Sequence, residues 1–210
     1  VEPGTYQTPR EPFPIALKPG VRLTSSGGAA VTTIDANSTS SVVSIVNATA
    51  GTELSGFTLI DGRNTYGGGV HVYNSVSRPA GWPVIAENVI KDNTATSVGG
   101  GIDVQAAPGM LAAPVIEDNS ISNNLASSGG GGVYCGPRSA PRLDGNRLTL
   151  NRATAGSGGG ILVGSDARPY IVDCRIVGLN HAVDGGGIAC LPSTAVTIDV
   201  VRCELGTNVA

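Results

Sequence analysis

The chain is poor in charged and aromatic residues and in long apolar runs. Only 14% of its 210 residues are charged and 4% are aromatic, with one Met and one Trp. No apolar stretch approaches the roughly 18 residues of a membrane-spanning helix. The net charge is −3 and there is no basic run. The composition therefore argues against a membrane span and against nucleic acid as a partner.

Cysteine is also scarce, and the familiar catalytic signatures are missing. The four cysteines form no C-x-x-C pair, so a zinc knuckle and a thioredoxin-type motif are absent. The chain contains no G-x-S-x-G, no H-E-x-x-H and no G-K-[ST] phosphate loop. From motifs alone we predict no catalytic residue and no cofactor.

Glycine, by contrast, is abundant and arranged in a repeat. Triple glycines return in "NTATSVGGGIDV", "NNLASSGGGGVYC", "NRATAGSGGGILV" and "NHAVDGGGIAC". Segments led by proline start at Pro83, Pro114, Pro141 and Pro169, at intervals of 31, 27 and 28 residues. An earlier copy starts at Leu54. Each unit holds three short segments of alternating apolar residues, which indicates strands and tight turns rather than helices.

A unit this small cannot bury its own apolar face, so the copies must stack. Stacking like positions at the strand spacing of about 4.8 Å makes a parallel β-helix. We predict an all-β solenoid of roughly seven coils and three parallel sheets, with residues 1–210 as one domain. Residues 1–50 form lead-in coils and residues 51–210 carry the glycine repeats. We expect this domain to be part of a longer chain.

Equivalent positions of successive units form columns. The apolar columns predicted to face inward begin at Ile85, Ile90, Ile102 and Val104. Two columns of asparagine at sharp bends, where left-handed φ is tolerated, are predicted to hydrogen-bond from coil to coil. Their members are Asn88, Asn119 and Asn146, continued by Cys174 and Cys203, and Asn93, Asn124, Asn151, Asn180 and Asn208.

The two cysteines of the first asparagine column lie on successive coils. Neighbours in register are about 4.8 Å apart, within the Cα separation that a disulfide allows. Cys174 and Cys203 therefore form either a disulfide or a buried ladder of free thiols. Cys135 and Cys190 share another column, but Val163 stands between them and no bond can form.

The "N-x-A-x-x-G-G-G-I" units and the lead-in "PGTY…FPIALKPGVRLTSSGG…TTIDA" resemble the right-handed parallel β-helix repeat proteins of the pectate-lyase-like superfamily, exported bacterial members among them. The resemblance implies a right-handed coil and a place outside the cell or on its surface. This fold serves lyases, hydrolases, epimerases and adhesins, so it implies no single activity.

The motifs of the related enzymes are missing. The chain lacks the paired aspartates and G-H-G of polygalacturonases and the R-x-P-x-x-R of pectate lyases. The leading hypothesis is therefore a non-catalytic, extracytoplasmic module that binds polysaccharide or serves as a surface scaffold. The alternative is a polysaccharide lyase or glycoside hydrolase of the same superfamily.

Acidic residues gather on the first predicted sheet, in two neighbouring columns. Carboxylates about 5 Å apart repel unless something neutralises them. A calcium ion would do so, and related lyases bind calcium on a sheet face. Arg147 and Arg175 are the competing partners, which would make a network of ion pairs instead. The candidate metal ligands are Glu87, Glu117, Asp118, Asp144 and Asp173.

Polar and aromatic residues follow the glycines on the predicted outer face of the third sheet. On successive coils they would line a shallow groove, in which aromatic rings stack on the pyranose faces of an extended sugar chain. An ordinary mixed strand surface is the alternative. The candidate glycan contacts are His71, Tyr73, Asp103, Gln105 and Tyr134.

A β-helix leaves an unpaired strand edge at each end, and natural solenoids cover these edges. No amphipathic helix is visible near either end of this sequence. We therefore expect flanking domains to cap the solenoid, or copies of the chain to associate end to end.

Overall fold

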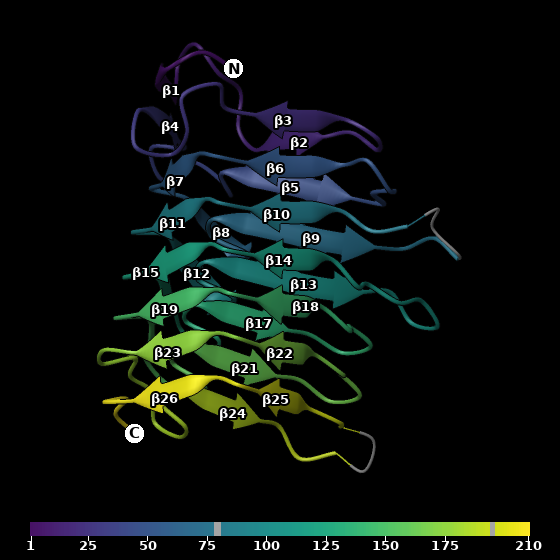
Figure 1. The fold of residues 1–210 in the computed structure, drawn as a ribbon, viewed down its shortest axis with the longest axis vertical. Coiled ribbons are helices and arrows are strands. Elements are labelled where there is room, and N and C mark those ends of the chain that lie inside the picture. The colour runs from purple at the N-terminus through teal and green to yellow at the C-terminus, as the bar shows by residue number, and fades with distance from the viewer. Residues whose placement is uncertain (78–80, 194–195) are drawn as a thin grey trace.

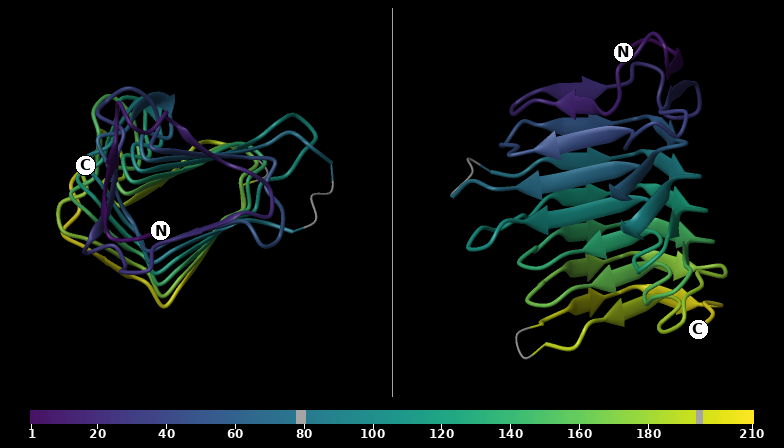
Figure 2. Two further views of the ribbon diagram at one scale, coloured as in Figure 1. Left: turned by 90° about the horizontal axis from the view of Figure 1, so that it is seen from above. Right: turned by 180° about the vertical axis from the view of Figure 1, so that it is seen from behind.

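The computed structural model describes residues 1–77, 81–193 and 196–210, and these residues form a column of stacked coils (Figure 1). All strand pairs named in it are parallel, and the described residues contain strands but no helix. Two of its sheets have seven strands each, which corresponds to the roughly seven coils predicted. Seen along the axis, the coils superimpose (Figure 2). The parallel β-helix predicted from the repeat is confirmed.

Two sheets come from the proline-led part of each unit. The first sheet contains β3 (Arg22–Thr24), β6 (Glu53–Ser55), β10 (Val84–Ala86), β14 (Val115–Glu117), β18 (Arg142–Asp144), β22 (Tyr170–Val172) and β25 (Asp199–Val201). The second contains β1 (Gly4–Gln7), β4 (Thr32–Asp35), β7 (Thr58–Ile60), β11 (Val89–Lys91), β15 (Ser120–Ser122), β19 (Arg147–Thr149), β23 (Arg175–Val177) and β26 (Glu204–Gly206).

The third sheet follows the glycines. It contains β2 (Ile15–Leu17), β5 (Val43–Val46), β9 (Val70–Asn74), β13 (Ile102–Ala106), β17 (Val133–Cys135), β21 (Ile161–Val163) and β24 (Ile188–Cys190). The loops that leave β13, β17 and β21 project from one edge of the stack (Figures 1 and 2).

The three predicted sheets are present, and a fourth sheet that was not predicted accompanies them. A short fourth sheet lies along the chain between the second sheet and the glycines, and contains β8 (Arg63–Tyr66), β12 (Thr94–Val98), β16 (Leu125–Ala126) and β20 (Arg152–Ala153). It forms because the alanine of the N-x-A motif is in register from coil to coil, as Ala95 with Ala126 and Ala126 with Ala153. These alanines are fully buried, so a small side chain is needed at this position.

The predicted apolar columns are confirmed as the core, except at the C-terminal end of two of them, where Ile188 is half-buried and Cys190 is exposed. Ile85 is in register with Ile116, and the column continues through Leu143 to Ile171. All four side chains are fully buried. The column that starts at Ile90 behaves in the same way as far as Ile176. The core is therefore one continuous cluster built from parallel aliphatic stacks.

Each glycine of a triplet meets a different obstacle, as Gly99, Gly100 and Gly101 illustrate. Gly99 has a left-handed φ of 70°, which favours glycine. A Cβ on Gly100 would collide with the carbonyl oxygen of Gly131 in the next coil. A Cβ on Gly101 would lie 2.6 Å from the carbonyl oxygen of Gly132. The triplets therefore allow successive coils to approach closely, in addition to allowing a tight turn.

Asparagine side chains form a continuous ladder inside the corner between the second and fourth sheets. Asn124 Oδ1 accepts hydrogen bonds from the backbone N–H and the Nδ2 of Asn93, both at 3.1 Å. Its own Nδ2 donates to the carbonyl of Ile90 at 2.9 Å and to Asn151 Oδ1 at 3.0 Å. The predicted coil-to-coil hydrogen bonds of asparagine are confirmed, and every rung is buried up to Asn180.

The left-handed residue at each corner is not the asparagine, contrary to the prediction from sequence. It is the residue immediately before each ladder position, where a side chain can point into solvent. The ladder asparagines keep ordinary φ values so that their amides can face the core. The left-handed residues of the two corners are Glu87, Asp118, Gly145, Asp173 and Arg202, and Asp92, Asn123, Leu150, Leu179 and Thr207.

Replacement of Gly100 by Ala should destabilise the protein strongly. The new methyl group meets backbone atoms of Gly131 and Leu125, which cannot move without separating two coils. We expect a loss of about 2–3 kcal/mol in the free energy of unfolding, measured by urea denaturation. Gly206→Ala is the matched control, because no heavy atom lies within 4 Å of a Cβ there. Equal stability of the two variants would contradict the close-approach explanation.

Candidate functional site

The third sheet brings the predicted glycan contacts into two adjacent columns. His71 is in register with Asp103, and Asp103 with Tyr134. Tyr73 is in register with Gln105, two residues further along the same strands. The sequence therefore predicted the relative placement of all five residues correctly. We call these five residues, together with Tyr66, the third-sheet site.

A hydrogen-bonded pair, His71 and Asp103, forms the centre of the third-sheet site. Nδ1 of His71 lies 2.7 Å from Oδ2 of Asp103. The second oxygen of the carboxylate accepts a hydrogen bond of 2.9 Å from Nε2 of Gln105. Both oxygens of Asp103 are therefore engaged, and the imidazole of His71 is fixed in orientation with Nε2 turned away from the carboxylate.

Asp103 is fully buried, although the sequence placed it on an open outer face. Asp103 is buried because the glycine turn at Gly99 folds over the strand that carries it. A Cβ on Gly99 would lie only 2.7 Å from the Cβ of Asp103. Burial raises the pKa of the Asp103 carboxyl, and the hydrogen bonds from His71 and Gln105 oppose that rise. The histidine thus compensates a carboxylate that would otherwise be costly to bury.

Three rings form an accessible row at the edge of the third-sheet site. The ring centroids of Tyr66 and His71 are 6.5 Å apart with an interplanar angle of 28°. The rings of His71 and Tyr73 are 6.1 Å apart at 13°. Tyr66 is 44% exposed, and the side chain of His71 is 23% exposed. Tyr66 was not singled out from the sequence, although it stands directly before a glycine triplet, in "NTYGGGV".

Tyr134 does not belong to this accessible row. Its exposure is 8%, and burial raises its pKa to about 12. Its ring lies against the backbone of Gly136, and its hydroxyl lies beside Gly164. The prediction that Tyr134 stacks on a sugar is therefore wrong for this conformation, because the ring is covered by the loops that leave the sheet.

The predicted metal ligands do lie in two neighbouring columns. Glu117 and Asp144 are in register at the ends of β14 and β18. Glu87, Asp118 and Asp173 occupy the left-handed corner beside them. Among the described residues, however, no three His, Cys, Asp or Glu side chains come close enough together to hold a metal ion. The described residues therefore offer no set of ligands for a calcium ion.

Arginines neutralise part of this acidic face. Two nitrogens of Arg202 lie 2.7 and 2.6 Å from the carboxylate oxygens of Asp173, and this hydrogen-bonded pair lowers the pKa of Asp173. Arg142 binds Asp144 at 2.6 Å. The sequence named different arginines, and one of these, Arg175, instead pairs with Glu204. The correct partner was visible in the repeat, because Arg202 and Asp173 hold equivalent positions.

The four cysteines are free thiols in this structure. Cys174 Sγ lies 3.6 Å from the carbonyl of Leu143, and Cys203 Sγ lies 3.6 Å from the carbonyl of Ile171. These are the carbonyls that the corresponding ladder asparagine would bind, as Asn146 binds that of Ile116. Of the two alternatives left open by the sequence, the structure has the thiol ladder and no disulfide.

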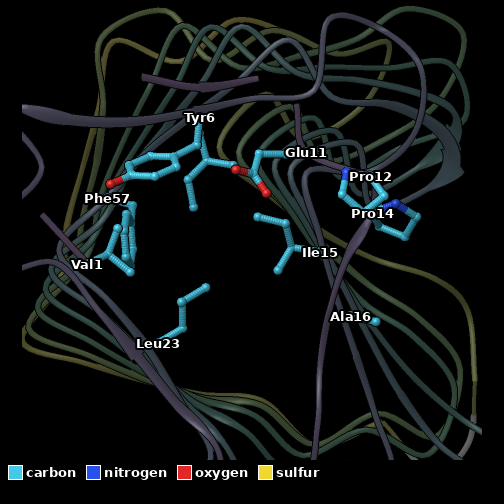
Figure 3. A pocket seen from close by; sticks show the side chains of 10 residues that line it. Val1, Tyr6, Glu11, Pro12, Pro14, Ile15, Ala16, Leu23 and Phe57 are labelled. Carbon is cyan, nitrogen blue, oxygen red and sulfur yellow. The ribbon is translucent and has the colours of Figure 1, made fainter. Parts of the chain in front are cut away.

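A hollow lies at the N-terminal end of the solenoid. It measures about 470 Å³ and is lined mostly by apolar side chains, with Phe57, Leu23 and Ile15 among them. Tyr6 and Glu11 also point toward it (Figure 3). These side chains continue the core columns of the coils below. The hollow holds no cluster of polar groups comparable with the third-sheet site, and end-to-end association stays a prediction.

The stacked parallel coils, the asparagine ladder and the polar outer face of the third sheet define a β-helix repeat protein. The chain belongs to the right-handed β-helix family, whose model for the right-handed beta helix region matches residues 19–209. Comparisons with curated proteins and with solved structures gave no significant match. The described residues contain no helix long and apolar enough to cross a membrane.

Titration of the denatured, unreduced protein with a thiol reagent should find four free thiols. Cys174 and Cys203 each have a backbone acceptor in place, so neither needs a disulfide to be satisfied. A count of two free thiols, together with a native disulfide between these two residues in peptide mapping, would contradict the thiol ladder.

Proposed function

We propose that this protein is a non-catalytic β-helix module that binds polysaccharide through the third-sheet site. The observation that carries the proposal is the row of Tyr66, His71 and Tyr73, whose rings are stacked at 6.1–6.5 Å on one accessible edge. Flat aromatic surfaces of this kind bury the apolar faces of ring-shaped ligands at little cost in conformational entropy.

The polar part of the site supports the same function. Asp103 holds the imidazole of His71, and Gln105 in turn holds the carboxylate of Asp103. The middle ring of the row is therefore fixed before a ligand binds. A fixed ring loses less freedom on binding than a mobile one, which favours affinity. Nε2 of His71 and the hydroxyls of Tyr66 and Tyr73 then supply hydrogen-bonding groups for sugar hydroxyls.

The shape of the fold supports an extended ligand. Successive coils repeat about every 4.8 Å, so a sheet face offers equivalent positions along a line. A polymer of sugar rings presents equivalent groups along a line as well. We place this module outside the cell or on its surface, as a polysaccharide-binding or scaffolding part. That location rests on the resemblance to exported β-helix proteins.

A polysaccharide lyase or hydrolase is the second candidate, and the His71–Asp103 pair is the observation that favours it. A carboxylate that holds Nδ1 of a histidine leaves Nε2 as a general base. Both reactions also need a group that protonates the leaving oxygen. The structure offers Tyr66 and Tyr73 beside His71, but no second carboxylate in the third-sheet site. Binding without turnover is therefore the better-supported function.

Substitution of Tyr73 by Ala should weaken polysaccharide binding. The protein would first be screened on an array of plant, algal and bacterial polysaccharides, and the strongest binder would be used in calorimetry. We expect Tyr73→Ala to reduce the affinity for the polysaccharide by about tenfold, because one of the three rings of the row is lost. The melting temperature of each variant would be measured alongside.

Tyr170→Ala is the matched control, because Tyr170 is a half-buried tyrosine on the first sheet that contacts Arg142. It should leave affinity unchanged. Product analysis of the same mixtures separates the two candidates: reducing ends or unsaturated sugars, lost in His71→Gln, would replace the binding function by the enzymatic one. Absence of any polysaccharide binding would overturn the proposal.

A further inference from the structure

Three stacked turns lie at the edge of the third sheet, where its strands end. They follow β13, β17 and β21, and each is closed by a backbone hydrogen bond: Met110 N–H to Ala107, Ser139 N–H to Gly136, and Ala167 N–H to Gly164. The second and third turns are joined by a bond of 2.8 Å from the N–H of Arg168 to the carbonyl of Ser139. These loops belong to the projecting edge of the stack (Figures 1 and 2).

The third position of each turn has a left-handed backbone. Gly109 occupies it in the first turn, with φ of 78°, and Asp166 in the third, with φ of 59°. In the second turn the residue is Arg138, with φ of 58°. Glycine, Asn and Asp are the residues that adopt this conformation readily, so an arginine here carries a backbone cost. Non-glycine residues adopt the same backbone at the ladder corners, Arg202 among them, so the feature that distinguishes Arg138 is its side chain.

The side chain of Arg138 is half-buried, and its Nε is fully buried without a hydrogen-bond acceptor among the described residues. A buried N–H of a charged group without an acceptor is costly. The hydroxyl of Ser139, the next residue, donates to the carbonyl of Gly136 at 2.7 Å and makes no hydrogen bond with Nε of Arg138.

Arg138 opens onto a cleft of about 410 Å³ that it shares with Arg168. Within the described ranges, neither guanidinium takes part in any of the six ion pairs of the structure. The one carboxylate in the cleft is Asp166, and its Oδ1 accepts a hydrogen bond of 3.1 Å from the hydroxyl of Ser193. The cleft therefore has two guanidinium groups and a net positive charge.

We propose that this cleft is a binding site for a tetrahedral oxyanion, in the form of sulfate. A guanidinium presents N–H donors in a fixed fork, and two forks from adjacent coils match the several oxygens of one sulfate group. The buried Nε of Arg138 is closed to the ligand, so the contacts would be made by the other N–H groups of the two guanidinium groups. The apolar side chains of Met110 and Leu111 line one side of the cleft.

The test is calorimetric titration with sodium sulfate, against sodium chloride at equal ionic strength, and thermal unfolding in the same solutions. Sulfate should bind the wild-type protein and raise its melting temperature. Arg138→Asn keeps a residue that tolerates the left-handed backbone but removes the guanidinium. This variant and Arg168→Gln should each weaken sulfate binding by about tenfold or more. Arg147→Gln, at an exposed arginine of the second sheet, is the matched control and should bind normally.

A second arm compares dextran sulfate with unsulfated dextran, which separates a free ion from a sulfate ester carried by a glycan. Binding of inorganic sulfate, or of dextran sulfate alone, supports the site provided that Arg138→Asn weakens it by the predicted factor. Without sulfate, Arg138→Asn should be at least as stable as the wild type, since it relieves strain and an unsatisfied donor. No binding of either sulfated probe, or equal binding by all variants, would overturn the proposal. Either result leaves the binding of polysaccharide at Tyr73 to be judged separately.

Discussion

The constraint on which the whole molecule depends is register between neighbouring coils. In this solenoid each backbone group, core side chain and ladder amide has its partner directly above or below. A chain of hydrogen-bonded asparagines enforces that register, since Asn124 binds Asn93 on one side and Asn151 on the other. A slip of one residue would break every rung and turn the core columns outward. The glycine triplets serve the same constraint, because they remove side chains where coils come closest.

The same constraint assembles the functional surfaces. His71 and Asp103 are 32 residues apart in sequence, and they meet because both hold the same position in successive units. Arg138 and Arg168 reach one cleft because their turns stack. In a solenoid, a substitution in one unit can therefore create a local site without altering the core. Function in such a protein is expected where a unit departs from the pattern of its neighbours.

The sequence predicted most of the fold because the pattern repeats at fixed positions. The columns that start at Ile85 and Ile90 could be aligned without a structure, and they are the core. Features that depend on how one coil covers another could not be predicted in this way. The burial of Asp103 and Tyr134 results from turns that fold over the third sheet. The pairing of Arg202 with Asp173, by contrast, was visible in the repeat, because the two residues hold equivalent positions. Tyr66 could also have been identified from the sequence, because it stands directly before a glycine triplet.

The most direct test of the register account is the free energy of unfolding of Asn124→Ala beside that of Asn123→Gly. The first variant removes the amide that joins three coils and leaves buried donors without acceptors, so a loss of about 3 kcal/mol or more is predicted. The second removes the adjacent exposed side chain while glycine keeps the left-handed backbone, and should cost at most about 1 kcal/mol. Equal losses in the two variants would contradict the central role of the ladder.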